Sequence, residues 1–135
     1  MSPKITQLIL VLLIWICSPQ LQAQQMPATT LNEVRNHISQ GNAEKLYEHL
    51  NENVEVTLLN SRKDYAKSQA KFVLKQFFSN YPPSGFSISH HASSGKSLYY
   101  ALGEYRSSKG QMVVNIFFKI KDGKYLIDRL RFDKK

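Results

Sequence analysis

The chain has 135 residues, enough for one domain, and its 18 Lys and Arg against 10 Asp and Glu give a net charge of +8. Its single cysteine, Cys17, lies near the N-terminus, so a domain without that segment has no disulfide, thiolate nucleophile or cysteine-bound metal. Such a domain depends on its hydrophobic core alone. The positive charge permits attraction to anionic partners without demonstrating it.

Residues 1–23 have the three-part layout of a secretory signal peptide. Lys4 supplies a positive start, residues 8–17 form an unbroken apolar run, and Ala23 is a small residue at the expected cleavage site. The run is too short to span a bilayer, which takes about 20 residues. We therefore expect an exported protein, periplasmic or secreted, that does not span the membrane. The alternative is an uncleaved anchor.

A single domain is expected over residues 31–133, after a polar lead-in at residues 24–30 that we expect to be disordered. Its first helix begins at residue 31, with Thr30 and Glu33 forming a capping box. Gly41 fits the position just after this helix, where a left-handed backbone is needed.

A second helix, a strand and a third helix are expected before the last four strands. Asn42 fits the N-cap of a second helix over residues 43–50. Alternating side chains over residues 54–58 predict a strand. Residues 60–64 are polar and basic, which predicts a connection, and a third helix is expected over residues 66–79.

The third helix is expected to supply much of the core. Phe77 belongs to its apolar face, and Phe72 and Phe78 widen that face. Lysines recur every fourth residue on the other side: Lys63, Lys67, Lys71 and Lys75.

Four strands close the chain, at residues 86–90, 97–107, 111–121 and 124–132. Asp122-Gly123 is a strong hairpin turn between the last two. One face of the third of these strands is wholly apolar: Met112, Val114, Ile116, Phe118 and Ile120. Short turns make the strands antiparallel, so the order helix, helix, strand, helix, four strands predicts an α+β domain with a mainly antiparallel sheet.

This order resembles the nuclear transport factor 2-like superfamily, whose cone is also called cystatin-like. The resemblance covers residues 31–132 and is carried by the helix–Gly–helix segment at residues 38–47, by Ala101-x-Gly103-x-Tyr105 and by the hairpin at residues 122–127. More narrowly, residues 67–78 and Leu130-Arg131-Phe132 are similar to small exported proteins of the Bacteroidetes described only as a domain of unknown function.

The resemblance implies a curved sheet wrapped round a helix, with a mouth that can hold a ligand. Within the cone, Tyr47, Tyr99 and Tyr105 are the candidates for ligand contact. The superfamily includes isomerases, dehydratases and hydrolases, and also non-enzymatic binding modules, so the fold alone does not choose between them. Dimers through the sheet are common in it.

Three residues are weak candidates for a catalytic acid or base. His90 and His91 are neighbours on a strand and point to opposite faces, so at most one faces the cone. Asp128 either points into the cone or occupies a bulge that returns it to water; the bulge buries more apolar side chains and is preferred. Glu104 raises the same question, because it shares a face with Tyr100 and opposes Tyr105.

No metal site and no cofactor are expected. His37 and His49 have no partner at metal-ligand spacing and are expected to be solvated. The sequence has no glycine-rich phosphate loop and no serine nucleophile elbow.

Nucleic acid is not an expected partner, because the helical lysines have no interleaved aromatic residues. A solvated helix face explains those lysines, and a weak anionic partner at the cell envelope is the remaining functional interpretation. On the sheet, Val113 and Phe117 are apolar on the face turned away from the helices, which predicts a homodimer interface. The leading hypothesis is an exported non-enzymatic binding or interaction module. The alternative is a small-molecule isomerase or hydrolase with its site inside the cone.

Overall fold

The computed structural model describes residues 26–95 and 97–135, so the predicted signal peptide at residues 1–23 lies outside the described residues. The helical elements are α2 (Ala28–Ser39), α3 (Ala43–Leu46), the 3-10 helix η1 (Tyr47–His49) and α4 (Lys67–Asn80). The strands are β1 (Leu50–Leu58), β2 (Ser61–Ala66), β3 (Pro83–Ser93), β4 (Leu98–Ser107), β5 (Gly110–Lys121) and β6 (Lys124–Lys134).

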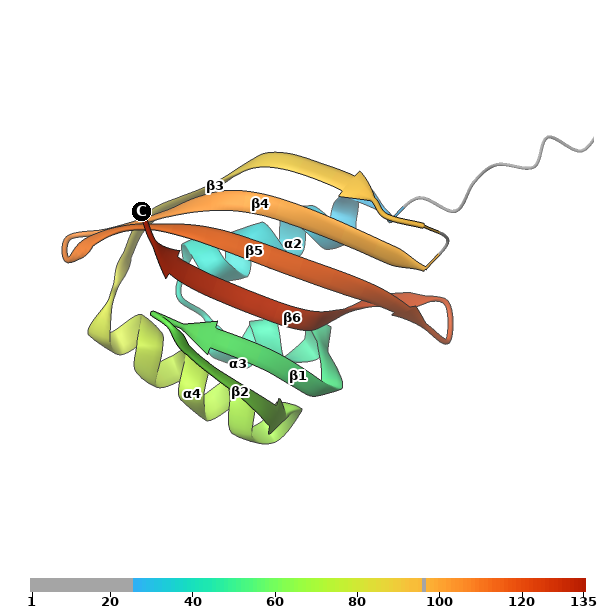
Figure 1. Cartoon of the computed structure of the whole chain (residues 1–135), viewed down its shortest axis with the longest axis horizontal. Coiled ribbons are helices and arrows are strands. Elements are labelled where there is room, and N and C mark those ends of the chain that lie inside the picture. Colours follow the sequence, from blue (N-terminus) through green and yellow to red (C-terminus); the bar gives the residue numbers. More distant parts are fainter. Residues whose placement is uncertain (1–25, 96) are drawn as a thin grey trace, which may run out of the picture.

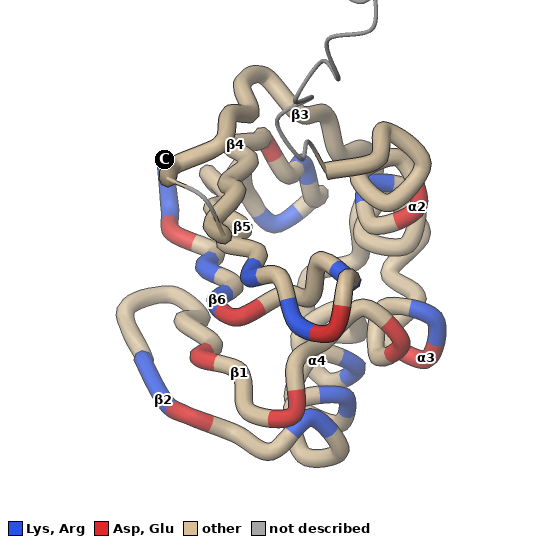
Figure 2. Tube along the Cα trace, turned by 90° about the vertical axis from the view of Figure 1, so that its right-hand side faces the viewer, with Lys and Arg blue, Asp and Glu red and all other residues tan. Residues whose placement is uncertain are grey.

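The six strands form one curved sheet in the order β2-β1-β6-β5-β4-β3. Neighbouring strands are antiparallel except β1 and β6, which run parallel. The helices lie on one face of the sheet, with α2 behind β3 to β5 and α4 along β1 and β2 (Figures 1 and 2). The α+β class and the mainly antiparallel sheet are confirmed.

The first helix begins earlier than its sequence predicts. It starts at Ala28 after Pro27, and no side chain caps it, so the capping box of Thr30 and Glu33 is wrong. Proline before the first turn has a fixed φ that suits a helix start, which explains the earlier beginning. Residues 28–30, expected to be disordered, are therefore helical.

The joint between α2 and α3 follows the sequence. Gly41 has φ of +64°, and the amides of Gly41 and Asn42 donate to the carbonyls of Ile38 and His37. These two bonds form the Schellman motif that a glycine at this position favours. The Asn42 side chain then accepts a hydrogen bond of 3.1 Å from the Lys45 amide, so its N-cap role is confirmed.

Two elements differ from the sequence prediction. The second helix ends at His49 as a 3-10 turn, and Leu50 is already the first residue of β1. Residues 61–64 of the expected connection belong to strand β2, which pairs with β1 across a turn at Leu59 and Asn60, both with positive φ. The side chains of β2 are exposed or half-buried, so the apolar alternation that reveals a strand is missing.

The core lies between the helices and the inner, concave face of the sheet. Phe77 is 4% exposed, and its ring centroid lies 4.6 Å from that of Phe132. The inner face of β5 is buried as predicted at Met112, Val114, Ile116 and Phe118. Phe72, however, is 66% exposed and does not widen the buried face of α4. Helix α4 packs against β1, β2 and α3 and leaves the Phe72 side uncovered.

Candidate ligand-binding site

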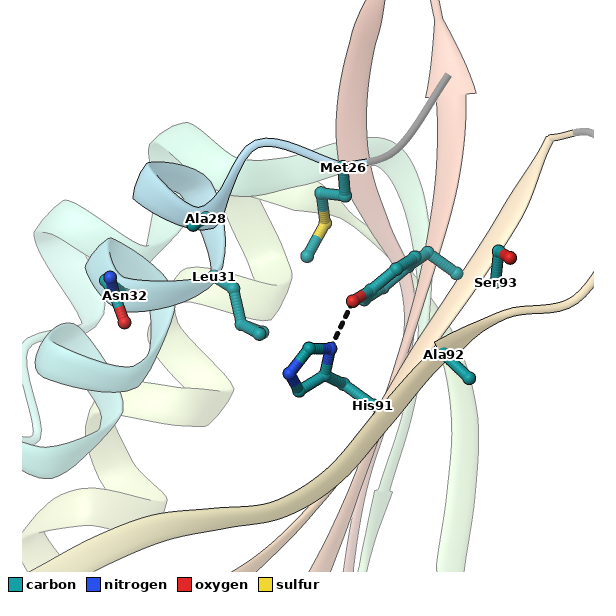
Figure 3. A pocket seen from close by; sticks show the side chains of 8 residues that line it. Met26, Ala28, Leu31, Asn32, His91, Ala92 and Ser93 are labelled. Atoms are coloured by element: carbon teal, nitrogen blue, oxygen red, sulfur yellow. Dashed lines mark hydrogen bonds between the residues drawn. The ribbon is translucent and has the colours of Figure 1, made fainter. Parts of the chain in front are cut away.

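A cavity of about 510 Å³ opens between the start of α2, the end of β3 and the start of β4 (Figure 3). None of its lining residues is a lysine, arginine, aspartate or glutamate. The lining residues are Met26, Ala28, Leu31, Asn32, His91, Ala92, Ser93 and Tyr99.

A bulge in β3 decides which histidine reaches this cavity. Ile88 pairs with Gly103 and His90 pairs with Leu102, so Ser89 is an extra residue in the strand. The extra residue reverses the alternation of side chains, because a strand changes face at every residue. His91 therefore lies on the inner face, opposite Ala101, and His90 lies on the outer face. The candidate His90 does not face the cone.

The polar centre of the cavity is the hydrogen bond between His91 Nδ1 and the Tyr99 hydroxyl. Burial raises the pKa of the Tyr99 hydroxyl, and the neighbouring Tyr125 raises it further. Tyr99 is therefore a protonated hydrogen-bonding group at neutral pH. In Figure 3 the side chains of Met26 and Leu31 approach this pair from the α2 side, so apolar side chains line the cavity beside the polar pair.

The sequence provided only part of this lining. Leu31 belongs to the apolar stripe of the first helix, and such stripes predict burial without distinguishing core from cavity wall. Met26 belongs to the lead-in that the sequence predicts to be disordered, and it is instead a buried residue just before α2. No local signal predicts its position, because the wall it completes belongs to β3 and β4.

The other two catalytic candidates lie on the outer face of the sheet. Asp128 is the extra residue of a bulge in β6, between the pairs of Phe117 with Arg129 and of Phe118 with Ile127. The preferred bulge interpretation is therefore right, and Asp128 lies 3.4 Å from the ammonium of Lys119.

Glu104 is bonded to Lys135 at 2.8 Å, and this hydrogen bond together with the lysine charge lowers the pKa of the Glu104 carboxyl. His90 contacts the hydroxyl of Tyr100 at 3.0 Å, also outside the cavity. None of the three catalytic candidates lines the cavity.

Of the three tyrosines predicted to face the cone, only Tyr99 lines the cavity. Tyr105 is fully buried and donates to the carbonyl of Tyr81, and burial raises the pKa of its hydroxyl. Tyr47 lies against α4, where Lys67 Nζ and Lys71 Nζ are 4.7 and 5.1 Å from its ring centroid. Tyr47 packs on a helix surface and Tyr105 fills the core on the inner face, so neither of these two candidates lines the cavity.

The sequence predicts that His37 and His49 are solvated, but both are half-buried and lie together between α2 and η1. Their ring centroids are 5.4 Å apart, and His49 Nε2 lies 3.5 Å from a Glu33 oxygen. Burial, followed by the neighbouring His37, lowers the pKa of His49. Among the described residues, no group of three or more His, Cys, Asp or Glu is arranged to hold a metal ion.

The outer face of the sheet carries a half-buried apolar strip. Its members on β5 are Val113 and Phe117, and the register of β4 adds Tyr100 and Leu102 beside them. The Arg129 guanidinium lies 5.6 Å from the Phe117 ring centroid. Within residues 26–95 and 97–135, no helix has the length and hydropathy needed to cross a membrane.

The curved sheet with helices on its inner face has the cone shape of the nuclear transport factor 2-like class of folds. The fold is similar to that of a domain with a cystatin-like fold from Nostoc punctiforme, at 11% identity and a TM-score of 0.63 over 79% of this chain and 74% of that one. It is also similar to a protein whose name includes NTF2, at 15% identity and a TM-score of 0.61 over 77% of this chain and 93% of that one.

Within this class, the chain belongs to the family described as a domain of unknown function, DUF4783, which it matches over residues 31–133. A DUF4783 family protein from Bacteroides fragilis is 27% identical, with a TM-score of 0.74 over 82% of this chain and 100% of that one. A comparison with curated proteins gives no match. The predicted resemblance, both to the superfamily and to the narrower group, is confirmed.

Proposed function

We propose that the protein is an exported, non-enzymatic binding module that holds a small, uncharged and partly apolar molecule in the cavity between α2 and β3. One observation carries this proposal: a cavity of about 510 Å³ without a lysine, arginine, aspartate or glutamate occurs in a chain of net charge +8. Pockets of this kind bind by burying apolar surface, and a few polar groups fix the orientation of the ligand. Here Met26 and Leu31 supply apolar surface, and the His91–Tyr99 pair supplies the polar group.

A neutral fluorescent probe tests the cavity. N-phenyl-1-naphthylamine, which is apolar and uncharged, is expected to bind and to gain fluorescence. His91→Trp fills the cavity with a larger ring and is expected to weaken binding on the order of tenfold. His90→Trp is the matched control, because the neighbouring residue lies on the outer face. Equal effects of both substitutions, or no effect of either, would contradict the proposed site.

Export rests on the signal-peptide pattern of residues 1–23. Cleavage after Ala23 leaves Gln24 as the first residue, two positions before Met26 at the cavity. Mass spectrometry of the protein from its native cells is expected to find an N-terminus at or near Gln24. An intact Met1 would contradict export by cleavage.

A second candidate function is a small-molecule isomerase or hydrolase that uses the same cavity. The observation that favours it is the His91–Tyr99 pair, which combines a base with a protonated hydroxyl inside a pocket. If a bound molecule is turned over, and Tyr99→Phe abolishes turnover while leaving probe binding intact, the enzyme is favoured. Binding without turnover favours the binding module.

We also propose that the module is a homodimer through the outer face of the sheet. Antiparallel sheets with one face in water usually alternate to polar residues on that face, whereas here Tyr100, Leu102, Val113 and Phe117 are half-buried there. A two-fold axis lets such a strip pair with itself. The oligomeric state in sedimentation velocity tests this step.

A further inference from the structure

Helix α4 presents an exposed phenylalanine to solvent. Among the described residues, only two large apolar side chains are exposed, Phe72 at 66% and Leu98 at 41%. Phe72 lies in the middle of α4, and the helical neighbours on its face, Ser68 and Gln76, are polar and exposed. A ring that stays in water removes little apolar area from solvent on folding, so Phe72 contributes little to the stability of the domain.

Lysines stand on one side of this ring. Lys71 Nζ lies 5.6 Å from the Phe72 ring centroid and 5.1 Å from that of Tyr47, so it stands between the two rings. Lys67 Nζ lies over Tyr47 at 4.7 Å. The expectation that no aromatic residues accompany the helical lysines is therefore wrong.

The charge of this surface is unbalanced. Glu44 lies 3.5 Å from Lys71 and 3.7 Å from Lys75, so one carboxylate is shared by two lysines, and Lys67 lies over Tyr47 instead. Figure 2 shows the basic positions following one another along α4. We call this surface the α4 patch and define it by Tyr47, Lys67, Lys71, Phe72 and Lys75.

We propose that the α4 patch docks the protein onto an anionic lipid surface, with Phe72 entering the headgroup boundary and the lysines contacting lipid phosphates. Interfacial anchors combine these features: an aromatic side chain in the boundary and basic side chains at its level, whose long stems keep the ammonium groups in water. Each lysine near an anionic membrane strengthens binding by about fivefold.

A lipid surface fits the α4 patch better than a protein does. Stable protein interfaces bury about 800 Å² on each partner around a cluster of apolar anchors. The α4 patch exposes a single large apolar side chain, because Tyr47 is half-buried beneath its lysines. One inserted ring with several cations is sufficient for reversible attachment to a membrane.

The position of α4 leaves the proposed cavity free. Helix α4 contacts β1 and β2 at one edge of the sheet, whereas the cavity lies between α2 and β3, the strand at the opposite edge (Figure 1). Docking through the α4 patch is therefore independent of ligand binding and goes beyond the proposed function.

Tryptophan placed at residue 72 reports the docking directly. Trp15 is the chain's single tryptophan and lies in the predicted signal peptide, so the exported, processed chain has none. Phe72→Trp is expected to show a blue-shifted emission with vesicles of phosphatidylglycerol and phosphatidylcholine, and no shift with phosphatidylcholine alone. Leu98→Trp is the matched control and is expected to show no shift with either. If Trp15 is retained, the unsubstituted protein supplies the background spectrum.

Cosedimentation with the same vesicles measures the affinity. Phe72→Ser is expected to weaken binding about fivefold or more, because it removes the inserted ring. Glu44→Gln is expected to strengthen it about fivefold by removing the opposing carboxylate. Leu98→Ser is expected to leave binding unchanged.

Three results would overturn the proposal. The first is no preference of the unsubstituted protein for anionic vesicles. The second is equal losses in Phe72→Ser and Leu98→Ser. The third is tight binding to heparin or single-stranded DNA without vesicle binding, which would assign the α4 patch to a polyanion.

Discussion

The two faces of the sheet differ although the same strands build them. The inner face buries Met112, Val114 and Ile116 against the helices, whereas the outer face leaves Val113 and Phe117 half-buried. Alternation along β5 explains how one strand serves both faces. The inner face therefore contributes mainly to stability, and the outer face has apolar surface available for association.

The largest expected effect concerns the inner face. Phe77→Ala is expected to lower the free energy of unfolding by about 3–5 kcal/mol, since Phe77 is buried against Phe132 and Tyr105. Phe72→Ala, on the same helix but exposed, is expected to change it by less than about 0.5 kcal/mol. Urea denaturation measures both. A loss below about 1 kcal/mol in Phe77→Ala would show that the inner face is not the source of stability.

The next effect concerns association through the outer face. Phe117→Glu is expected to convert a dimer to a monomer at micromolar concentration, because it places two charges near the proposed two-fold axis. Phe72→Glu serves as the matched control and is expected to leave the dimer intact. Sedimentation velocity distinguishes them. A monomer in the unsubstituted protein would remove the dimer from the proposal.

A smaller loss of stability is expected at acidic pH, through His49 on the helical side of the sheet. Because burial and His37 lower the pKa of His49 from 6.5, the folded state binds fewer protons than the unfolded state below that pH. The contribution of neutral His49 to the free energy of unfolding is complete above pH 6.5. It is lost as the pH falls from there through the lower pKa of the folded state. Urea midpoints at about pH 7 and about pH 5 are expected to differ less in His49→Gln than in the unsubstituted protein. If the midpoint difference is the same in His49→Gln and in the unsubstituted protein, the acid sensitivity belongs to other groups. His90→Gln is the control, because it removes a histidine from the outer face.

The smallest effect is expected at the β6 bulge. Asp128→Asn removes the charge that pairs with Lys119 on the outer face. Such half-exposed pairs contribute about 1 kcal/mol or less, and added salt reduces the contribution. A loss of several kcal/mol would mean that the Asp128 charge holds the bulge, and with it the inward position of Ile127 and Leu130.

Elements with local signals could be predicted from the sequence. Gly41 and Asn42 fix the joint of the first two helices, and alternation along β5 separates its two faces. The β6 bulge was also predictable, because only an extra residue at Asp128 puts Ile127 and Leu130 on the buried side.

Features that depend on neighbours distant in the chain could not be predicted in this way. Strand β2 is held by hydrogen bonds to β1 and has no apolar pattern of its own, so nothing local predicts it. The bulge at Ser89 places His91 rather than His90 in the cavity, since the pairing with β4 sets the register. Phe72 fits an apolar helix face by sequence, but no element packs on that side of α4. Periodicity shows which residues share a face, and only the assembled fold decides which faces are covered.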